Sequence, residues 1–142
     1  MLNIKSIMIL LISTLLFSNE RVYTDNELFM KENLVYEKKT NTLINGLRVA
    51  HYKSGAIKFK YPYVKGKLDG LAIMYYKSGR VEYETPYTSG KVNGVKRGYY
   101  KSGKKWFEVK VENDKALFGY VYKPSGRKKD MTKKEFKKLG LL

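Results

Sequence analysis

The tetrapeptide Tyr-Lys-Ser-Gly occurs three times in this 142-residue chain, and each copy begins 24 residues after the one before it. The copies begin at Tyr52, Tyr76 and Tyr100, and a fourth, degenerate copy reads Tyr122-Lys123-Pro124-Ser125-Gly126. A fixed period of about 20 to 50 residues is the signature of a repeat protein. Because each repeat contacts mainly its neighbours, we expect such a chain to work through an extended surface rather than through one catalytic pocket.

Glycines recur with the same period and mark two kinds of turn. Glycine reaches positive φ without a steric clash, as tight β-hairpins require. We therefore predict a hairpin turn at each Ser-Gly and a longer hairpin connection at each Gly-Lys-x-x-Gly between copies. At the third junction Asp114-Lys115 stands where Gly-Lys stood. The repeat glycines are Gly46, Gly55, Gly66, Gly70, Gly79, Gly90, Gly94, Gly103 and Gly126.

The residues between the turns alternate in the way that half-buried strands do. Aromatic and aliphatic residues of the second half of each copy fall on one face and charged residues on the other, with Trp106 assigned to the charged side. Pro62 and Pro86 occupy matching positions, where we expect strand pairing to loosen or bulge. The pattern predicts an all-β fold: an elongated, single-layer antiparallel β-meander of hairpin repeats, with a short C-terminal capping helix.

The pattern Tyr-x-x-Gly followed by Gly-Lys-x-x-Gly, over roughly residues 45–126, resembles the MORN repeat. The variant is the bacterial one found in YwqK-type antitoxins of toxin–antitoxin systems. The resemblance implies a MORN-type single-layer β-meander and a protein-binding role, of the antitoxin or immunity type. MORN repeats elsewhere are linked to membrane recruitment and protein scaffolding.

The ends of the chain differ from the repeats. Residues 1–18 read as a signal peptide, with Lys5 before an apolar stretch, and an uncleaved N-terminal anchor is the alternative. We therefore expect an exported protein that is periplasmic, envelope-associated or secreted. Residues 19–45 are interpreted as an N-terminal extension or cap, residues 46–126 as the repeats, and residues 127–142 as a basic C-terminal capping helix.

Two capping-box patterns favour helices outside the repeats. Thr132 with Glu135 predicts a helix start near the C-terminus, where Gly140 is a plausible stop. Thr24 with Glu27 offers a similar start near the N-terminus. Because terminal repeats need capping, we expect the C-terminal helix to shield the end of the sheet.

The residue types needed for catalysis are scarce. The chain has no cysteine and a single histidine, His51, at the repeat position occupied elsewhere by Tyr75 and Tyr99. A nucleophilic triad needs an orienting base, and a metal site needs a cluster of ligands. We therefore predict a protein that is not an enzyme and has no catalytic, cofactor-binding or metal-binding residues.

Thirteen tyrosines are a further signal. At the turns, Tyr52, Tyr76 and Tyr100 are interpreted as structural residues that pack beside the glycines. Aromatic residues of the strands have two interpretations, stacking between strands or forming an exposed recognition surface. The candidate partner-binding residues are Tyr61, Tyr63, Tyr83, Tyr87 and Phe107.

The net charge of +16 leaves two partners open. We expect an unidentified protein partner, bound through the sheet. The alternative is an anionic membrane or polysaccharide surface, bound through the lysines of an envelope-associated module. Lysines that only keep an exposed sheet soluble and unaggregated would give the same composition. Nucleic acid is an unlikely partner for a chain predicted to leave the cytoplasm.

Overall fold

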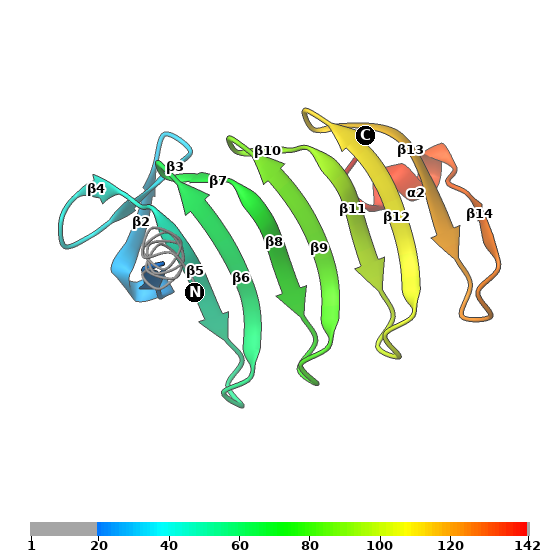
Figure 1. Cartoon of the computed structure of the whole chain (residues 1–142), viewed down its shortest axis with the longest axis horizontal. Coiled ribbons are helices and arrows are strands. Elements are labelled where there is room, and N and C mark those ends of the chain that lie inside the picture. Colours follow the sequence, from blue (N-terminus) through cyan, green and yellow to red (C-terminus); the bar gives the residue numbers. More distant parts are fainter. Residues whose placement is uncertain (1–19, 142) are drawn as a thin grey trace, which may run out of the picture.

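A computed structural model describes residues 20–141, and the predicted signal peptide lies outside the described residues. Figure 1 shows one elongated, open sheet of hairpins placed side by side, with a smaller sheet at its N-terminal end and a helix near its C-terminal end. The predicted fold, a single-layer antiparallel meander with a short C-terminal helix, is confirmed. The strand order of the main sheet is β1-β5-β6-β8-β9-β11-β12-β13-β14.

Each repeat is one long hairpin. The three hairpins are β5 with β6, β8 with β9, and β11 with β12. Their strands are β5 (Gly46–His51), β6 (Ile57–Val64), β8 (Gly70–Tyr75), β9 (Val81–Thr88), β11 (Gly94–Tyr99) and β12 (Lys105–Glu112). Two-residue strands β7 (Lys67–Leu68) and β10 (Lys91–Val92) continue the chain beyond β6 and β9.

The Ser-Gly turns have one geometry in all copies. In the first, the Tyr52 amide donates to the Ala56 carbonyl at 2.8 Å and the Gly55 amide donates to the Tyr52 carbonyl at 2.9 Å. Gly55 has a φ of 85°, which glycine adopts without strain. This is a three-residue hairpin loop closed by a left-handed glycine.

The turns between repeats are tighter. Each spans two residues that both have positive φ, the geometry that matches the twist of a hairpin. The φ values are 47° and 73° at Lys65-Gly66, 49° and 88° at Ser89-Gly90, and 47° and 69° at Asn113-Asp114. Asn and Asp tolerate this conformation, so the third junction keeps the turn although its glycine is lost.

A β-bulge interrupts each repeat and changes which side chains share a face. The register shifts by one residue beside Lys58, Glu82 and Trp106, which are 24 residues apart. An extra residue in one strand resets the alternation. The assignment of Trp106 to the charged side was therefore wrong, because its ring contacts Phe107 edge-on at 5.2 Å and packs against a hydrophobic core cluster.

The prolines loosen pairing on one side only. Pro62 pairs with Leu47 and Pro86 with Leu71 without any shift of register, so no bulge occurs there. Towards the next repeat, pairing between β6 and β8 covers two residue pairs and stops before Pro62. Proline has no amide hydrogen to offer to a second strand.

The third repeat carries Lys110 where the other two have proline. Strand β12 pairs with β13 (Lys115–Tyr122) from Phe107 to Glu112. Its pairing with the element that follows is therefore longer than in the first two repeats.

The fourth copy is one residue shorter than the sequence pattern implied. The Lys123 amide donates to the Arg127 carbonyl and the Gly126 amide donates to the Lys123 carbonyl. These bonds place Lys123, and not Tyr122, at the position of the repeat tyrosine. Tyr122 instead occupies the position of His51 and Tyr75.

The N-terminal region is a cap of different construction. A two-residue strand β1 (Val22–Tyr23) pairs parallel with β5, and a 3-10 turn η1 (Asp25–Glu27) follows it. A separate sheet is then formed by β2 (Leu28–Lys31), β3 (Leu34–Glu37) and β4 (Thr42–Leu43).

The helix predicted after Thr24 is wrong, although the capping box with Glu27 is present. The turn ends at Leu28, where pairing with Glu37 of β3 begins and the leucine side chain becomes buried. Strand pairing and burial therefore outweigh the local helix signal.

The C-terminal segment adds a strand before its helix. Residues 127–142 were predicted as a capping helix, but β14 (Lys128–Asp130) first pairs with β13 at the sheet edge. Helix α2 (Lys133–Lys138) then begins with the Thr132–Glu135 capping box. It ends at Lys138, and Gly140, two residues later, has a φ of 66°. In Figure 1, α2 passes behind β12 and β13.

The main sheet has two distinct faces. We call the face of Phe59, Tyr83 and Phe107 the aromatic face, and the face of Glu84, Arg97 and Glu108 the charged face. The N-terminal cap covers one end of the aromatic face, with Ile44 fully buried beside Tyr63. Helix α2 covers the other end through Phe136 and Leu139.

Candidate binding groove

A groove lies in the middle of the aromatic face, between its two covered ends. Its volume is about 340 Å³. The first two repeats and the start of the third form its floor, and the end of α2 forms one wall. The lining residues are Tyr61, Leu68, Ala72, Met74, Tyr83, Thr85, Tyr87, Lys96, Lys138 and Leu139.

The groove exists because only the ends of this face are covered. Phe59, Tyr83 and Phe107 share one repeat position, yet Phe59 is 9% exposed and Phe107 is fully buried, while Tyr83 is half-buried. A single-layer sheet has no second layer to complete its core. The middle repeat therefore leaves apolar and aromatic surface accessible to a partner.

The structure separates the five candidate partner-binding residues into two groups. Tyr61, Tyr83 and Tyr87 are half-buried and line the groove. Tyr63 is 6% exposed under the N-terminal cap and Phe107 is 0% exposed under α2. These two are corrected to core residues, because the covering segments leave them nothing to offer a partner.

Several groove residues were missed by sequence reasoning. Met74, Thr85 and Lys96 come from the strands, and Lys138 and Leu139 come from α2. Lys96 had a usable signal, because it stands 48 residues after Arg48 and so occupies the same position two repeats later. No sequence pattern indicated that α2 would reach the groove.

Lys96 is the unusual charge of the groove. Burial lowers the pKa of its ammonium group, and no other cause contributes. Among residues 20–141, no carboxylate lies within ion-pair distance of it. A half-buried cation without a counter-ion costs free energy, which an anionic ligand would recover.

Arg48, its equivalent in the first repeat, is in a different state. Its Nε donates to Asp25 Oδ1 at 2.7 Å, and its guanidinium lies over the Phe59 ring at 5.2 Å from the centroid. Burial alone would lower the pKa of Arg48, but the hydrogen bonds to Asp25 and Tyr63 raise it. The N-terminal cap therefore supplies a carboxylate to the first repeat that the third repeat lacks.

The repeated tyrosines of the turns bond one repeat to the next. The hydroxyls of Tyr52 and Tyr76 each donate to a backbone carbonyl of the following repeat at 2.6 Å, at Tyr75 and Tyr99 respectively. Tyr100 donates in the same way to Tyr122 at 2.7 Å. These contacts give the three tyrosines a structural place at the edge of the sheet, away from the groove.

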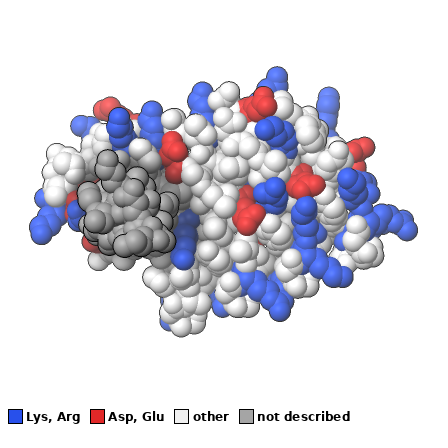
Figure 2. All heavy atoms as spheres, viewed as in Figure 1, with Lys and Arg blue, Asp and Glu red and all other residues white. Residues whose placement is uncertain are grey.

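The charged face satisfies its own polar groups. Tyr99 donates to Glu84 Oε2 at 2.8 Å, and Lys105 Nζ contacts Glu108 Oε2 at 2.7 Å. Burial and the bond to Glu84 raise the pKa of Tyr99 to about 12. Figure 2 shows acidic and basic side chains close together in the middle of this face. Glu84 and Glu108 are therefore already paired on this face, unlike Lys96 on the other.

The single histidine of the chain lies outside the groove. His51 is exposed at the end of β5. Within the part of the chain that the structure describes, no three His, Cys, Asp or Glu residues are grouped as metal ligands. In that same part, no helix combines the length and apolar character needed to cross a lipid bilayer.

Comparison of the chain with family models, with curated proteins and with solved structures finds no match.

Proposed function

We propose that this protein is an exported, non-enzymatic, MORN-type repeat protein that binds a partner protein through the central groove. The observation that carries the proposal is the accessible row of Tyr61, Tyr83 and Tyr87 between two covered ends of the aromatic face. Rigid aromatic side chains in a concave apolar site are the usual anchors of protein recognition. An antitoxin or immunity role is one form that such binding would take.

Two features of the sheet support a binding role. The tyrosine bonds between repeats and the covers at both ends hold the groove in one shape, which lowers the ordering cost of binding. On the charged face, by contrast, Glu84 and Glu108 already bond to Tyr99 and Lys105, so the two faces are not equivalent.

The experiment is a pull-down from envelope extract with the purified protein as bait. The groove variant combines Tyr83→Ala with Tyr87→Ala, and the matched control combines Phe118→Ala with Tyr120→Ala on the charged face. We expect one saturable partner that the control retains and the groove variant loses. Equal capture by both variants, with both folded by circular dichroism, would show that the groove is not the binding site.

Export is tested separately by mass spectrometry of the protein purified from its native cells. We expect the mature chain to begin near residue 19. An intact Met1 in the envelope fraction would contradict cleavage and favour the retained anchor.

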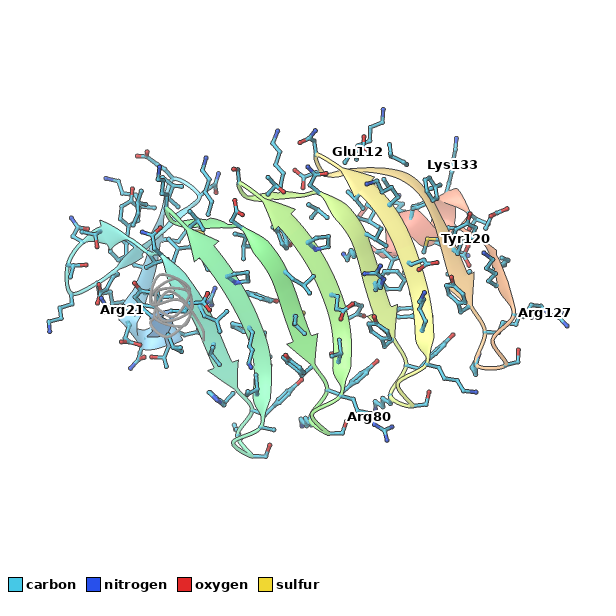
Figure 3. The ribbon with its side chains drawn as sticks, viewed as in Figure 1. Arg21, Arg80, Glu112, Tyr120, Arg127 and Lys133 are labelled. Atoms are coloured by element: carbon cyan, nitrogen blue, oxygen red, sulfur yellow. The ribbon has the colours of Figure 1, made fainter. Side chains whose placement is uncertain are left out.

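A second candidate function is attachment to an anionic lipid or polysaccharide surface. The Tyr-Lys-Ser-Gly turns lie side by side at one end of the strands, and we call this border of the sheet the turn edge. Arg80 and Arg127 point away from the sheet there (Figure 3). Hollows between successive turns are lined by Tyr52, Lys53, Ser54 and Lys77 and by Tyr76, Lys77, Ser78, Arg80, Glu82 and Lys101. The linings of these hollows contain four basic residues against one acidic residue, which makes this edge attractive to a polyanion.

Salt dependence tests this second candidate. Phosphatidylglycerol vesicles and an acidic polysaccharide should each retain the protein at low ionic strength and release it at high salt, because the contact is mainly electrostatic. The combination of Lys53→Gln, Lys77→Gln and Lys101→Gln should abolish retention. Retention by neither surface at low salt would eliminate this candidate.

A further inference from the structure

We propose that the ligand of the central groove is an acidic, extended segment of a partner protein, and that one of its carboxylates pairs with Lys96. The inference rests on the proposed function, since it names the chemistry of the partner at the same groove. Three observations support it. The ammonium of Lys96 has no ion-pair partner among residues 20–141, and the described groove lining contains no acidic residue. Arg48 makes a comparable contact with Asp25 elsewhere in the chain.

Among residues 20–141, the groove lining has cations and no anions. Its lining includes Lys96 and Lys138, and no Asp or Glu is among the residues that form it. The two lysines come from two different elements, β11 and the end of α2. A carboxylate entering between the tyrosines would meet positive charge there, in surroundings that water screens less than it screens the outer surface.

The chain contains its own example of such a contact. Arg48, Ala72 and Lys96 share one repeat position on the aromatic face. At the first of these positions the N-terminal cap brings Asp25 onto Arg48 at 2.7 Å. At the last position no segment of residues 20–141 supplies the equivalent carboxylate. A partner's carboxylate would form with Lys96 the kind of ion pair that Asp25 forms with Arg48.

The same example shows what should flank the carboxylate. Asp25 lies between Tyr23 and Leu28, and both of these are buried against the sheet. The N-terminal cap therefore contacts the aromatic face through an acidic residue that has a buried apolar residue on each side of it in the sequence. Met74, Tyr83 and Tyr87 offer comparable apolar surface around Lys96. We infer that the partner segment also carries aromatic or aliphatic residues on both sides of its acid.

An anionic lipid or sugar fits this groove less well. Arg48 and Lys96 lie on the aromatic face, away from the turns that carry Lys53, Lys77 and Lys101. A single half-buried cation among tyrosines suits one carboxylate with apolar neighbours, and not a dense array of charges. The peptide is thus the occupant that matches both the charge and the apolar lining.

The experiment probes the full chain against an array of random twelve-residue peptides at physiological salt. The wild-type protein is compared with Lys96→Met and with Lys115→Met, which removes the same charge from an exposed position of β13. We expect the bound peptides to be enriched in Asp or Glu flanked by apolar residues. Lys96→Met should weaken their binding about tenfold, the effect of losing one charge-assisted hydrogen bond. Lys115→Met should change binding little.

Each contrary result has a distinct meaning. If Lys96→Met and Lys115→Met weaken binding equally, the attraction is general and the inference is overturned. If the bound peptides lack acidic residues, or Lys96→Met leaves them bound, the carboxylate contact is wrong. Should Tyr83→Ala with Tyr87→Ala still abolish binding in that case, the groove function itself survives. If no peptide binds the wild-type protein, the inference fails, and the pull-down alone decides the proposed function.

Discussion

The first and third repeats differ from the middle repeat in what covers them. At one shared position, Phe107 is buried under α2, and Phe59 is buried beneath the Arg48 guanidinium, which the N-terminal cap holds through Asp25. Tyr83 is half-buried. The third repeat, under α2, also buries Val109 and Val111 fully. The hairpin is the same in all three cases, so burial is decided by segments outside the repeats. The difference teaches that the groove is the part of one continuous face that received no cover.

The largest expected effect is on the covered end. Phe107→Ala should lower the free energy of unfolding by about 3–5 kcal/mol, because it empties a fully buried site. Tyr83→Ala, at the same position of the open repeat, should cost only about 1–2 kcal/mol, in line with its partial burial. Urea unfolding followed by circular dichroism measures both. Equal losses would break the distinction between covered and open repeats.

Gly98→Ala tests how tightly α2 holds the covered end. A Cβ at Gly98 would stand 2.2 Å from Cε1 of Phe107, a ring that has no room to move. We expect a loss of about 1–3 kcal/mol, typical of overpacking. Ala50 has the same position in the first repeat, and Ala50→Gly is the matched control. A thermal melt of Gly98→Ala that matches the wild type would contradict this packing.

The tyrosines of the turns should not distinguish covered from open repeats. Tyr52→Phe, Tyr76→Phe and Tyr100→Phe each remove one hydroxyl bond to the next repeat, and each should cost about 1 kcal/mol. Chemical denaturation of the three variants measures this. A much larger loss for one of them would mean that the covers also support the turn edge.

Alkaline titration gives the smallest effect. The bond to Glu108 and burial raise the pKa of Tyr122 to about 12, as burial and Glu84 do for Tyr99. Because these folded values exceed the unfolded value of about 10, their stabilising contribution is complete below pH 10. It is lost as the pH rises towards 12. Absorbance of tyrosinate should show two late titrations, and Glu108→Gln should shift one of them to lower pH.

Much of the fold could be predicted because the period exposes it. Gly55 and the glycines at equivalent positions indicate turns that need positive φ. The residues between these turns alternate between apolar and charged, as strand residues do. The bulges could not be predicted, since Trp106 reads as an ordinary position of an alternating strand. The early end of the helical turn after Thr24 could not be predicted either. Its capping box is present, and only the pairing of the following residues with β3 ends the helix after one turn.

The candidate site was predicted in part. Tyr61, Tyr83 and Tyr87 follow from the alternation, which places aromatic residues on one face. The burial of Tyr63 and Phe107 depends on where the N-terminal cap and α2 fold back, which no local pattern records. Lys96 becomes meaningful only when Arg48 is seen with Asp25, because a repeat position gains its chemistry from its neighbours in space.

The bonds from each turn tyrosine to the next repeat have a consequence for how such a protein changes its length. Every donor and acceptor of this series belongs to the repeat itself, so an added copy of residues 70–93 would bring both its own hydroxyl and its own carbonyl. Two further strands would widen the open part of the sheet by about 9.6 Å, the spacing of two strands. Duplication of one repeat would thus widen the partner-binding face by a fixed increment, without any change to the N-terminal cap or to α2.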